Sequence, residues 1–172
     1  MDSRSGSSPS LYREIQHFRQ VWLWALVLFI SLLSLYGAFQ QLILREPFGN
    51  NPAPDSMMVV LAIIFGIGLP LFMYMTNLTT EIRSDGLYFR FSPFHRSFHR
   101  IAAEEIKRYE ACNYSPIRDY GGWGIRYGRK GKAYNVSGNR GVQLELSKGK
   151  HLLVGSQKPE ELVEALNTTL GR

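Results

Sequence analysis

The sequence predicts an α+β protein in which a two-helix transmembrane hairpin precedes an antiparallel β sandwich or barrel of about seven strands with a C-terminal helix. Three observations predict this order. Two long uncharged apolar runs occupy the first half of the chain, apolar and polar residues alternate through much of the second half, and the last residues carry an apolar stripe at helical spacing. The charge follows the same division: 16 of the 20 Lys and Arg residues and 10 of the 14 Asp and Glu residues come after Thr80, so the net charge of +6 belongs to that part.

The two apolar runs extend from Gln20 to Leu44 and from Ser56 to Thr80, and neither contains a charged residue. About 20 apolar residues in a helix cross the hydrocarbon core of a bilayer. Each run therefore predicts one span, at about residues 21–44 and 57–78. Ion-coupled transporters need ionisable groups within the membrane, so the uncharged runs argue against a transporter.

Basic residues flank the two runs on one side. Arg13 and Arg19 precede the first run, and four arginines between residues 83 and 100 follow the second, whereas the connecting loop contains only Arg45. Basic flanks remain in the cytoplasm. We therefore expect a multi-pass protein of the cytoplasmic membrane with both termini in the cytoplasm.

The spans divide the chain into three parts. Residues 1–10 are small and polar, and we expect a disordered tail. Residues 11–78 comprise an interfacial lead-in helix and the two spans, and residues 79–172 form a cytoplasmic domain. The lead-in helix is indicated by apolar residues at helical spacing, namely Leu11, Ile15 and Phe18.

Turn signals separate the alternating segments of the cytoplasmic domain. Asp-Gly and Gly-rich turns between apolar alternations predict β-hairpins. Turns are expected at Ser84–Gly86, Ala102–Glu105, Gly128–Gly131 and Ser147–Gly149. Pro159, followed by Glu160 and Glu161, opens the C-terminal helix, because proline and acidic residues favour a first helical turn.

The segment from Pro93 to Arg100 (PFHRSFHR) has the composition of a membrane-surface loop. Aromatic residues suit the acyl boundary and basic residues suit phosphate groups. The candidate contacts are Phe94, His95, Arg96, Phe98, His99 and Arg100. In the alternative, the two phenylalanines fill the domain core and the arginines are merely solvated. The histidines are four residues apart, but without a nearby carboxylate they predict no metal site.

The segment from Tyr120 to Gly141 is the most unusual, with seven glycines among its 22 residues. Its aromatic and basic residues predict a groove for a protein or an anionic partner. The candidate contacts are Trp123, Arg126, Tyr127, Arg129, Lys130, Lys132, Tyr134 and Arg140. In the alternative, the segment is only a twisted hairpin. Its glycine spacing is not a dinucleotide fingerprint, and a domain tied to a bilayer is a poor candidate for nucleic-acid binding.

A helical hairpin followed by TEIRSDGLYFRF, YGGWGIRYGRKGKAYNVSGNRGVQLEL and GSQKPEEL resembles an uncharacterised family of small prokaryotic two-span membrane proteins with one bacterial pleckstrin-homology-like domain. The resemblance covers Tyr12 to about Leu166. It implies about seven strands in a bent sandwich closed by the C-terminal helix, and a binding module with no assigned catalytic residues or cofactor. It does not imply the phosphoinositide site of eukaryotic relatives, because the loop that carries that site is here the tight Ser84–Gly86 turn.

The leading expectation is thus a non-enzymatic, membrane-anchored binding module. Two alternatives remain. One is an accessory subunit whose spans bind a larger membrane complex. The other is a lipid- or anion-handling enzyme, which would need one of His95, His99 and His151 to converge with Glu104, Glu105 or Asp119. The lone Cys112 is expected to be a small buried hydrophobe.

Overall fold

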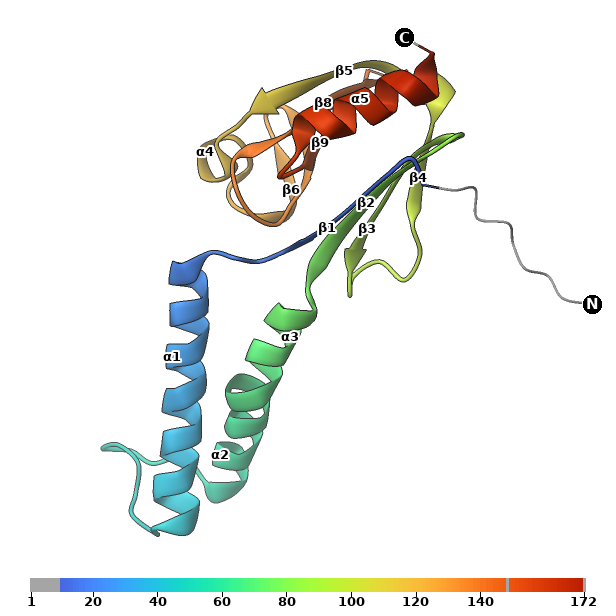
Figure 1. Cartoon of the computed structure of the whole chain (residues 1–172). Helices are drawn as coiled ribbons and strands as arrows, with labels where there is room; N and C mark the ends of the chain where they lie inside the picture. Colours follow the sequence, from blue (N-terminus) through green and yellow to red (C-terminus); the bar gives the residue numbers. More distant parts are fainter. Residues whose placement is uncertain (1–9, 148, 172) are drawn as a thin grey trace, which may run out of the picture. The chain divides into compact units, whose positions relative to one another are not determined.

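The computed structural model of the chain describes residues 10–147 and 149–171, so the expected tail lies, except for Ser10, outside the described residues. The chain forms two compact units (Figure 1). A helical unit comprises Phe18–Thr76. A β unit combines the chain up to His17 with the chain from Asn77 onwards. The strand-rich part of the protein therefore begins before the apolar helices.

The helical unit contains two helices that pack side by side (Figure 1). The first consists of α1 (Val21–Ala38) and the π-helical segment η1 (Phe39–Ile43), and the second of α2 (Asp55–Leu61), the π-helical segment η2 (Ala62–Gly68) and α3 (Leu69–Met75). Both are long and apolar enough to cross a membrane, as predicted. The second helix ends earlier than expected, because Leu78 is fully buried in the β unit.

Serine hydroxyls connect the two helices. Ser34 Oγ donates to the carbonyl of Leu61 at 3.0 Å, and Ser31 Oγ donates to the carbonyl of Gly66. Both acceptors are backbone oxygens of the second helix, so the two serine hydroxyls tie the helices together.

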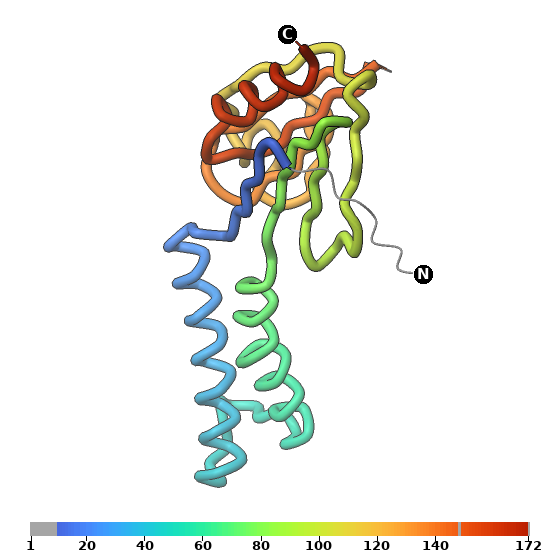
Figure 2. The backbone as a smooth tube through the Cα atoms, turned by 45° about the vertical axis from the view of Figure 1, so that its right-hand side comes forward, coloured from blue at the N-terminus to red at the C-terminus, as the bar shows by residue number. Residues whose placement is uncertain are grey.

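Sheet A is antiparallel throughout, in the order β1-β2-β3-β4. Its strands are β1 (Tyr12–His17), β2 (Asn77–Arg83), β3 (Gly86–Ser92) and β4 (His99–Ala102). The Ser84–Gly86 turn joins β2 to β3 as predicted. β1 pairs with β2 from Tyr12 opposite Ile82 to His17 opposite Asn77, as the blue and green traces show in Figure 2. The helical unit is thus an insertion between two neighbouring strands.

The lead-in helix expected within residues 11–20 is wrong, because most of this segment is β1. Leu11 and Ile15, which suggested a helix, are 53% and 46% exposed. The alternate residues Tyr12, Glu14 and Gln16 are the more buried ones, and they are polar. A strand with a polar buried face lacks the apolar alternation by which strands are recognised.

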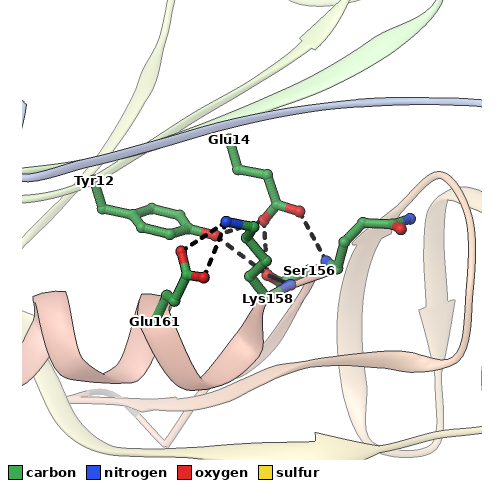
Figure 3. A network of polar contacts seen from close by, with 6 residues as sticks. Tyr12, Glu14, Ser156, Lys158 and Glu161 are labelled. Atoms are coloured by element: carbon green, nitrogen blue, oxygen red, sulfur yellow. Dashed lines mark hydrogen bonds and ion pairs between the residues drawn. The ribbon is translucent and has the colours of Figure 1, made fainter.

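A polar network anchors β1 to the segment between β9 (His151–Gly155) and α5 (Pro159–Leu170) (Figure 3). The Glu14 carboxylate accepts hydrogen bonds from Tyr12 Oη at 2.8 Å, Ser156 Oγ at 2.7 Å and Gln157 N at 2.8 Å. Burial raises the pKa of Tyr12, which keeps this hydroxyl a donor. Gln16 adds a bond from Nε2 to the carbonyl of Gly155 at 2.6 Å. Polar contacts therefore hold the inner face of this edge strand.

Sheet B has the order β5-β8-β9-β7-β6. Its remaining strands are β5 (Ile106–Asn113), β6 (Gly124–Gly128), β7 (Gly131–Asn135) and β8 (Arg140–Leu146). β7 and β9 are parallel, while the other pairs are antiparallel. The short helices η3 (Ala103–Glu105) and α4 (Pro116–Tyr120) flank β5.

The strand count and the pairing correct the predicted fold. The described residues form nine strands in two sheets and no closed barrel, so the estimate of about seven, the all-antiparallel pairing and the barrel alternative are wrong. β1 and β4 are the two strands that were not expected. β4 lies partly within the segment Pro93–Arg100, which was expected to be a loop.

The two sheets and α5 share the core of the β unit. The ring of Phe89 in β3 lies 4.5 Å from the ring of Tyr134 in β7, which joins the sheets. α5 packs against strands of both sheets. Leu162 and Leu166, from its predicted apolar stripe, are each 1% exposed. The C-terminal helix is thus confirmed, together with its buried face.

We expect Glu14→Ala to lower the free energy of unfolding by about 2 kcal/mol, because it removes three hydrogen bonds to a charged acceptor that is partly exposed. Urea denaturation of the full chain in detergent, followed by near-UV circular dichroism, would measure the change. Glu164→Ala, an exposed position in α5, is the matched control. Equal stability of the two variants would contradict the anchoring role of Glu14.

Candidate functional site

Residues from the two predicted contact regions meet at one place in the β unit. His95, in the β3–β4 segment, and His99, in β4, have ring centroids 4.1 Å apart. His99 stacks on Phe89 at 5.6 Å, and His95 lies 5.7 Å from the ring of Tyr134 in β7. The histidines of the predicted surface loop therefore adjoin the predicted Gly-rich hairpin.

Lys132 extends this meeting point to the surface. Its Nζ lies 4.7 Å from the ring centroid of Tyr134 and 5.2 Å from that of Tyr127, which are cation–π distances. Tyr127 is 77% exposed. We refer to these residues as the basic aromatic cluster: His95, His99, Tyr127, Lys132 and Tyr134.

The basic aromatic cluster has no acidic counterpart. Within the part of the chain that the structure describes, no carboxylate forms an ion pair with His95, His99 or Lys132. Partial burial, together with neighbouring His99 and Lys132, lowers the pKa of His95. The backbone N–H of Phe91 donates to His95 Nδ1 at 3.3 Å, so Nε2 carries the proton of the neutral ring. An anion would relieve the repulsion among these groups.

The cluster lies near the end of sheet A at which the chain leaves for the helical unit. Asn77 is opposite His17 on one side and opposite Ser92 on the other. The β3–β4 segment starts directly after Ser92. This end of the sheet therefore combines both chain connections with the segment that carries His95.

Within the rest of the predicted loop, Phe98 packs against arginines of β2 and β3. The guanidinium groups of Arg83 and Arg90 lie 5.5 and 4.9 Å from the ring of Phe98. Phe94 is 61% exposed and Phe98 is partly exposed, so neither phenylalanine fills the core. Arg96 is exposed as well. His99 and Arg100 belong to β4, and the loop prediction was wrong for these two residues.

The Gly128–Gly131 turn of the Gly-rich hairpin is confirmed, with β6 and β7 as its strands. Two glycines let the turn approach neighbouring backbone. A Cβ at Gly128 would lie 2.1 Å from the carbonyl oxygen of Asp119, and a Cβ at Gly131 would lie 2.2 Å from that of His151. Gly131 also has φ +101°, a conformation that favours glycine. These close approaches fix the position of Arg129 and Lys130.

Arg129 and Lys130 line a cavity of about 370 Å³ on the outer face of sheet B. This is the face on which α4 packs, since the hydroxyl of Tyr120 in α4 donates to Gln143 Oε1 of β8 at 3.2 Å. Lys132 and Tyr134, by contrast, belong to the basic aromatic cluster. The turn of this hairpin therefore contributes to the cavity, while side chains of its strand β7 contribute to the basic aromatic cluster.

Three of the predicted hairpin contacts join neither place. Trp123 Nε1 donates to the carbonyl of Gly138 at 3.1 Å, and Arg126 Nε donates to the carbonyl of Trp123 at 2.9 Å. Arg140 forms an ion pair with Glu160 at the start of α5. The eight residues predicted to line a single groove therefore lie at several separate places, and partner binding by each of them stays a prediction.

The residues needed for acid–base catalysis are dispersed. Glu104 and Glu105 are exposed in η3. Asp119 accepts a hydrogen bond from the backbone N–H of Ser115 at 2.8 Å. Within residues 10–147 and 149–171, no hydrogen bond or ion pair links these carboxylates to His95, His99 or His151, and no group of three or more His, Cys, Asp or Glu side chains is arranged to hold a metal ion.

Sequence reasoning missed the residues that form the walls of the cavity. Cys112 and Glu110 of β5 are alternate residues and lie opposite Gly141 and Gln143 of β8. This alternation indicates that Glu110 and Cys112 share one face of sheet B. The sequence does not show that the turn of the Gly-rich hairpin lies over that face and encloses the cavity. Cys112 was expected to be a small buried hydrophobe. It is half-buried against the cluster of Tyr114 and Tyr120 and also lines the cavity.

The family profile of DUF6141, described as a family of unknown function, matches residues 4–171. A comparison with curated proteins gives no match.

We expect Gly131→Ala to lower the free energy of unfolding by about 3 kcal/mol or more, because both the backbone conformation and the His151 carbonyl oppose a Cβ. Gly138→Ala is the control, since Gly138 also has positive φ (+77°) but its added Cβ would have no atom of the described residues within 4 Å. Its cost should be about 1 kcal/mol. Urea denaturation would measure both variants, and equal losses would show that the close approach to His151 contributes nothing.

Proposed function

We propose that this chain, which belongs to the DUF6141 family, is a membrane-anchored, non-catalytic binding module whose β unit holds an anionic lipid headgroup at the basic aromatic cluster. One observation carries the proposal. His95, His99 and Lys132 converge at one surface, and no carboxylate of the described residues pairs with them.

The membrane anchor is supported by the two helices that are long and apolar enough to cross a bilayer. Many of their apolar side chains are exposed, among them Phe29 at 64% and Ile67 at 59%. Exposed apolar surface costs roughly 25 cal/mol per Å² in water, and lipid would remove that cost. The basic flanks support an orientation with both termini in the cytoplasm.

We further propose that the β unit is pleckstrin-homology-like. Two packed sheets and a C-terminal helix against them support this assignment. The unit departs from the expected pattern in its nine strands, its parallel β7–β9 pair and the helical unit inserted after β1. The Ser84–Gly86 turn is too short to carry a ligand loop, so the proposed anion site lies at the basic aromatic cluster instead.

The chemistry of the cluster suits a phosphate group. Lys132 offers ammonium donors and His95 offers the N–H of Nε2. Each basic group near an anionic leaflet contributes roughly 1 kcal/mol of attraction. The exposed rings of Tyr127 and Phe94 suit the headgroup and upper acyl levels, where aromatic residues are enriched.

Chain connections support a lipid as the source of the phosphate. β1 ends at His17 and α1 begins at Val21, while only Thr76 separates α3 from β2. Each extended residue spans at most about 3.5 Å. The chain therefore tethers the end of sheet A that carries the cluster by short segments to helices that we propose to be embedded in the bilayer.

We expect anionic lipid to slow hydrogen exchange in residues 93–99 and 127–134 by at least about fivefold, because headgroup binding orders both segments. The full chain would be placed in nanodiscs of phosphatidylcholine alone or with phosphatidylglycerol. Protection should increase from about pH 7.5 to about pH 5.5. A bound phosphate raises the pKa of His95, which partial burial and the neighbouring His99 and Lys132 otherwise lower, so protonation and binding favour each other. Protonation of Nδ1 ends the hydrogen bond from Phe91 N–H, and the bound anion has to offset that loss.

The triple variant His95→Gln, His99→Gln, Lys132→Gln should lose this protection, whereas Arg118→Gln, a position with a side chain 84% exposed in α4, should retain it. Soluble glycerol 3-phosphate added to phosphatidylcholine discs tests the other source of phosphate. Equal protection by the soluble compound would overturn the lipid assignment. Equal exchange in both lipid compositions, or a protected triple variant, would overturn the site.

A further inference from the structure

A cavity on the outer face of sheet B takes no part in the function proposed above. Its volume is about 370 Å³, within the range of small-ligand sites. Its lining comes from β5, β8, β9, α4 and the turn of the Gly-rich hairpin. Elements that are distant in the sequence therefore meet at the cavity, as expected for a site whose shape is set by the whole fold rather than by one loop.

The cavity has aromatic and polar walls. The rings of Tyr114 and Tyr120 meet edge to face at 5.9 Å, and the two residues are 6% and 3% exposed. Tyr120 Oη donates to Gln143 Oε1 at 3.2 Å. This bond orients the amide of Gln143 in the cavity wall.

The charge at the cavity is positive. Glu110 lies 3.7 Å from Arg108, measured between Oε2 and Nη2, and is thereby partly neutralised. Arg129 and Lys130 are exposed, and within the described residues neither forms an ion pair. The glycines on both sides bring the backbone of the turn that carries these two cations close to the carbonyl groups of Asp119 and His151. The fold thus places unneutralised cations over an aromatic wall.

We propose that this cavity binds a small organic anion, with its anionic group at Arg129 and Lys130 and a flat apolar body against Tyr114 and Tyr120. Carboxylate and phosphate both satisfy arginine and lysine as charge-assisted acceptors. An aromatic body fits the edge-to-face preferences of the tyrosine rings. The inference goes beyond the proposed function, because it concerns the opposite side of the Gly-rich hairpin from the basic aromatic cluster.

Cys112 provides the readout for a test. It is the only cysteine of the chain and it lines the cavity. Burial raises the pKa of its thiol, so alkylation by iodoacetamide is slow and sensitive to coverage. The full chain in phosphatidylcholine nanodiscs would be alkylated with and without benzoate or phenyl phosphate, and the rate followed by mass spectrometry of the intact chain. Benzamide serves as the neutral analogue.

Both anions, or one of them, should slow alkylation saturably, by about tenfold at a concentration ten times the Kd, while benzamide should not. Protection by only one anion identifies the anionic group that the site prefers. The variant Arg129→Gln, Lys130→Gln should lose protection, measured as the ratio of its own rates with and without each anion, because the charge of Lys130 lowers the pKa of Cys112 and its loss slows alkylation even without ligand. Arg126→Gln, on the same hairpin but outside the cavity, should behave as wild type. Protection equal to that of benzamide, or protection unchanged in the double variant, would overturn the proposal.

Discussion

The pairing of β1 with β2 is the interaction on which the rest of the structure depends. The two strands are neighbours in sheet A although the whole helical unit separates them in the chain. Both ends of that unit are therefore fixed at one end of one sheet, at His17 and Asn77. The polar network around Glu14 holds β1 against the β9–α5 segment and so secures an edge strand that contributes little apolar surface.

The elements with strong local signals could be predicted. The two apolar helices, the Ser84–Gly86 turn and the Gly128–Gly131 turn are present as expected. β1 was missed because its inward residues are polar, and β4 because it has only four residues and begins within a segment whose composition indicated a surface loop. The parallel β7–β9 pair depends on contacts distant in sequence, which local periodicity does not encode.

The composition of the sequence indicated which segments carry candidate site residues, but it did not indicate how those residues are arranged. Basic and aromatic residues in two segments indicated anion binding, and His95, Lys132 and Tyr134 do come together. Sequence could not show that one hairpin serves two places, because side chains alternate between the faces of a sheet. It also could not show the cavity wall of Tyr114 and Gln143, since those residues meet only through the packing of α4 on sheet B.

If the helical unit is an insertion between β1 and β2, the β unit should fold without that unit but not without β1. The most direct measurement compares the urea denaturation of two soluble variants. In one, Asn-Gly replaces residues 18–76, because His17 and Asn77 are directly opposed and a two-residue turn can join them. In the other, the chain starts at Asn77. We expect cooperative unfolding of the first variant and loss of the folded state in the second. Equal stability of the two, or an unfolded first variant, would contradict the dependence of the β unit on β1.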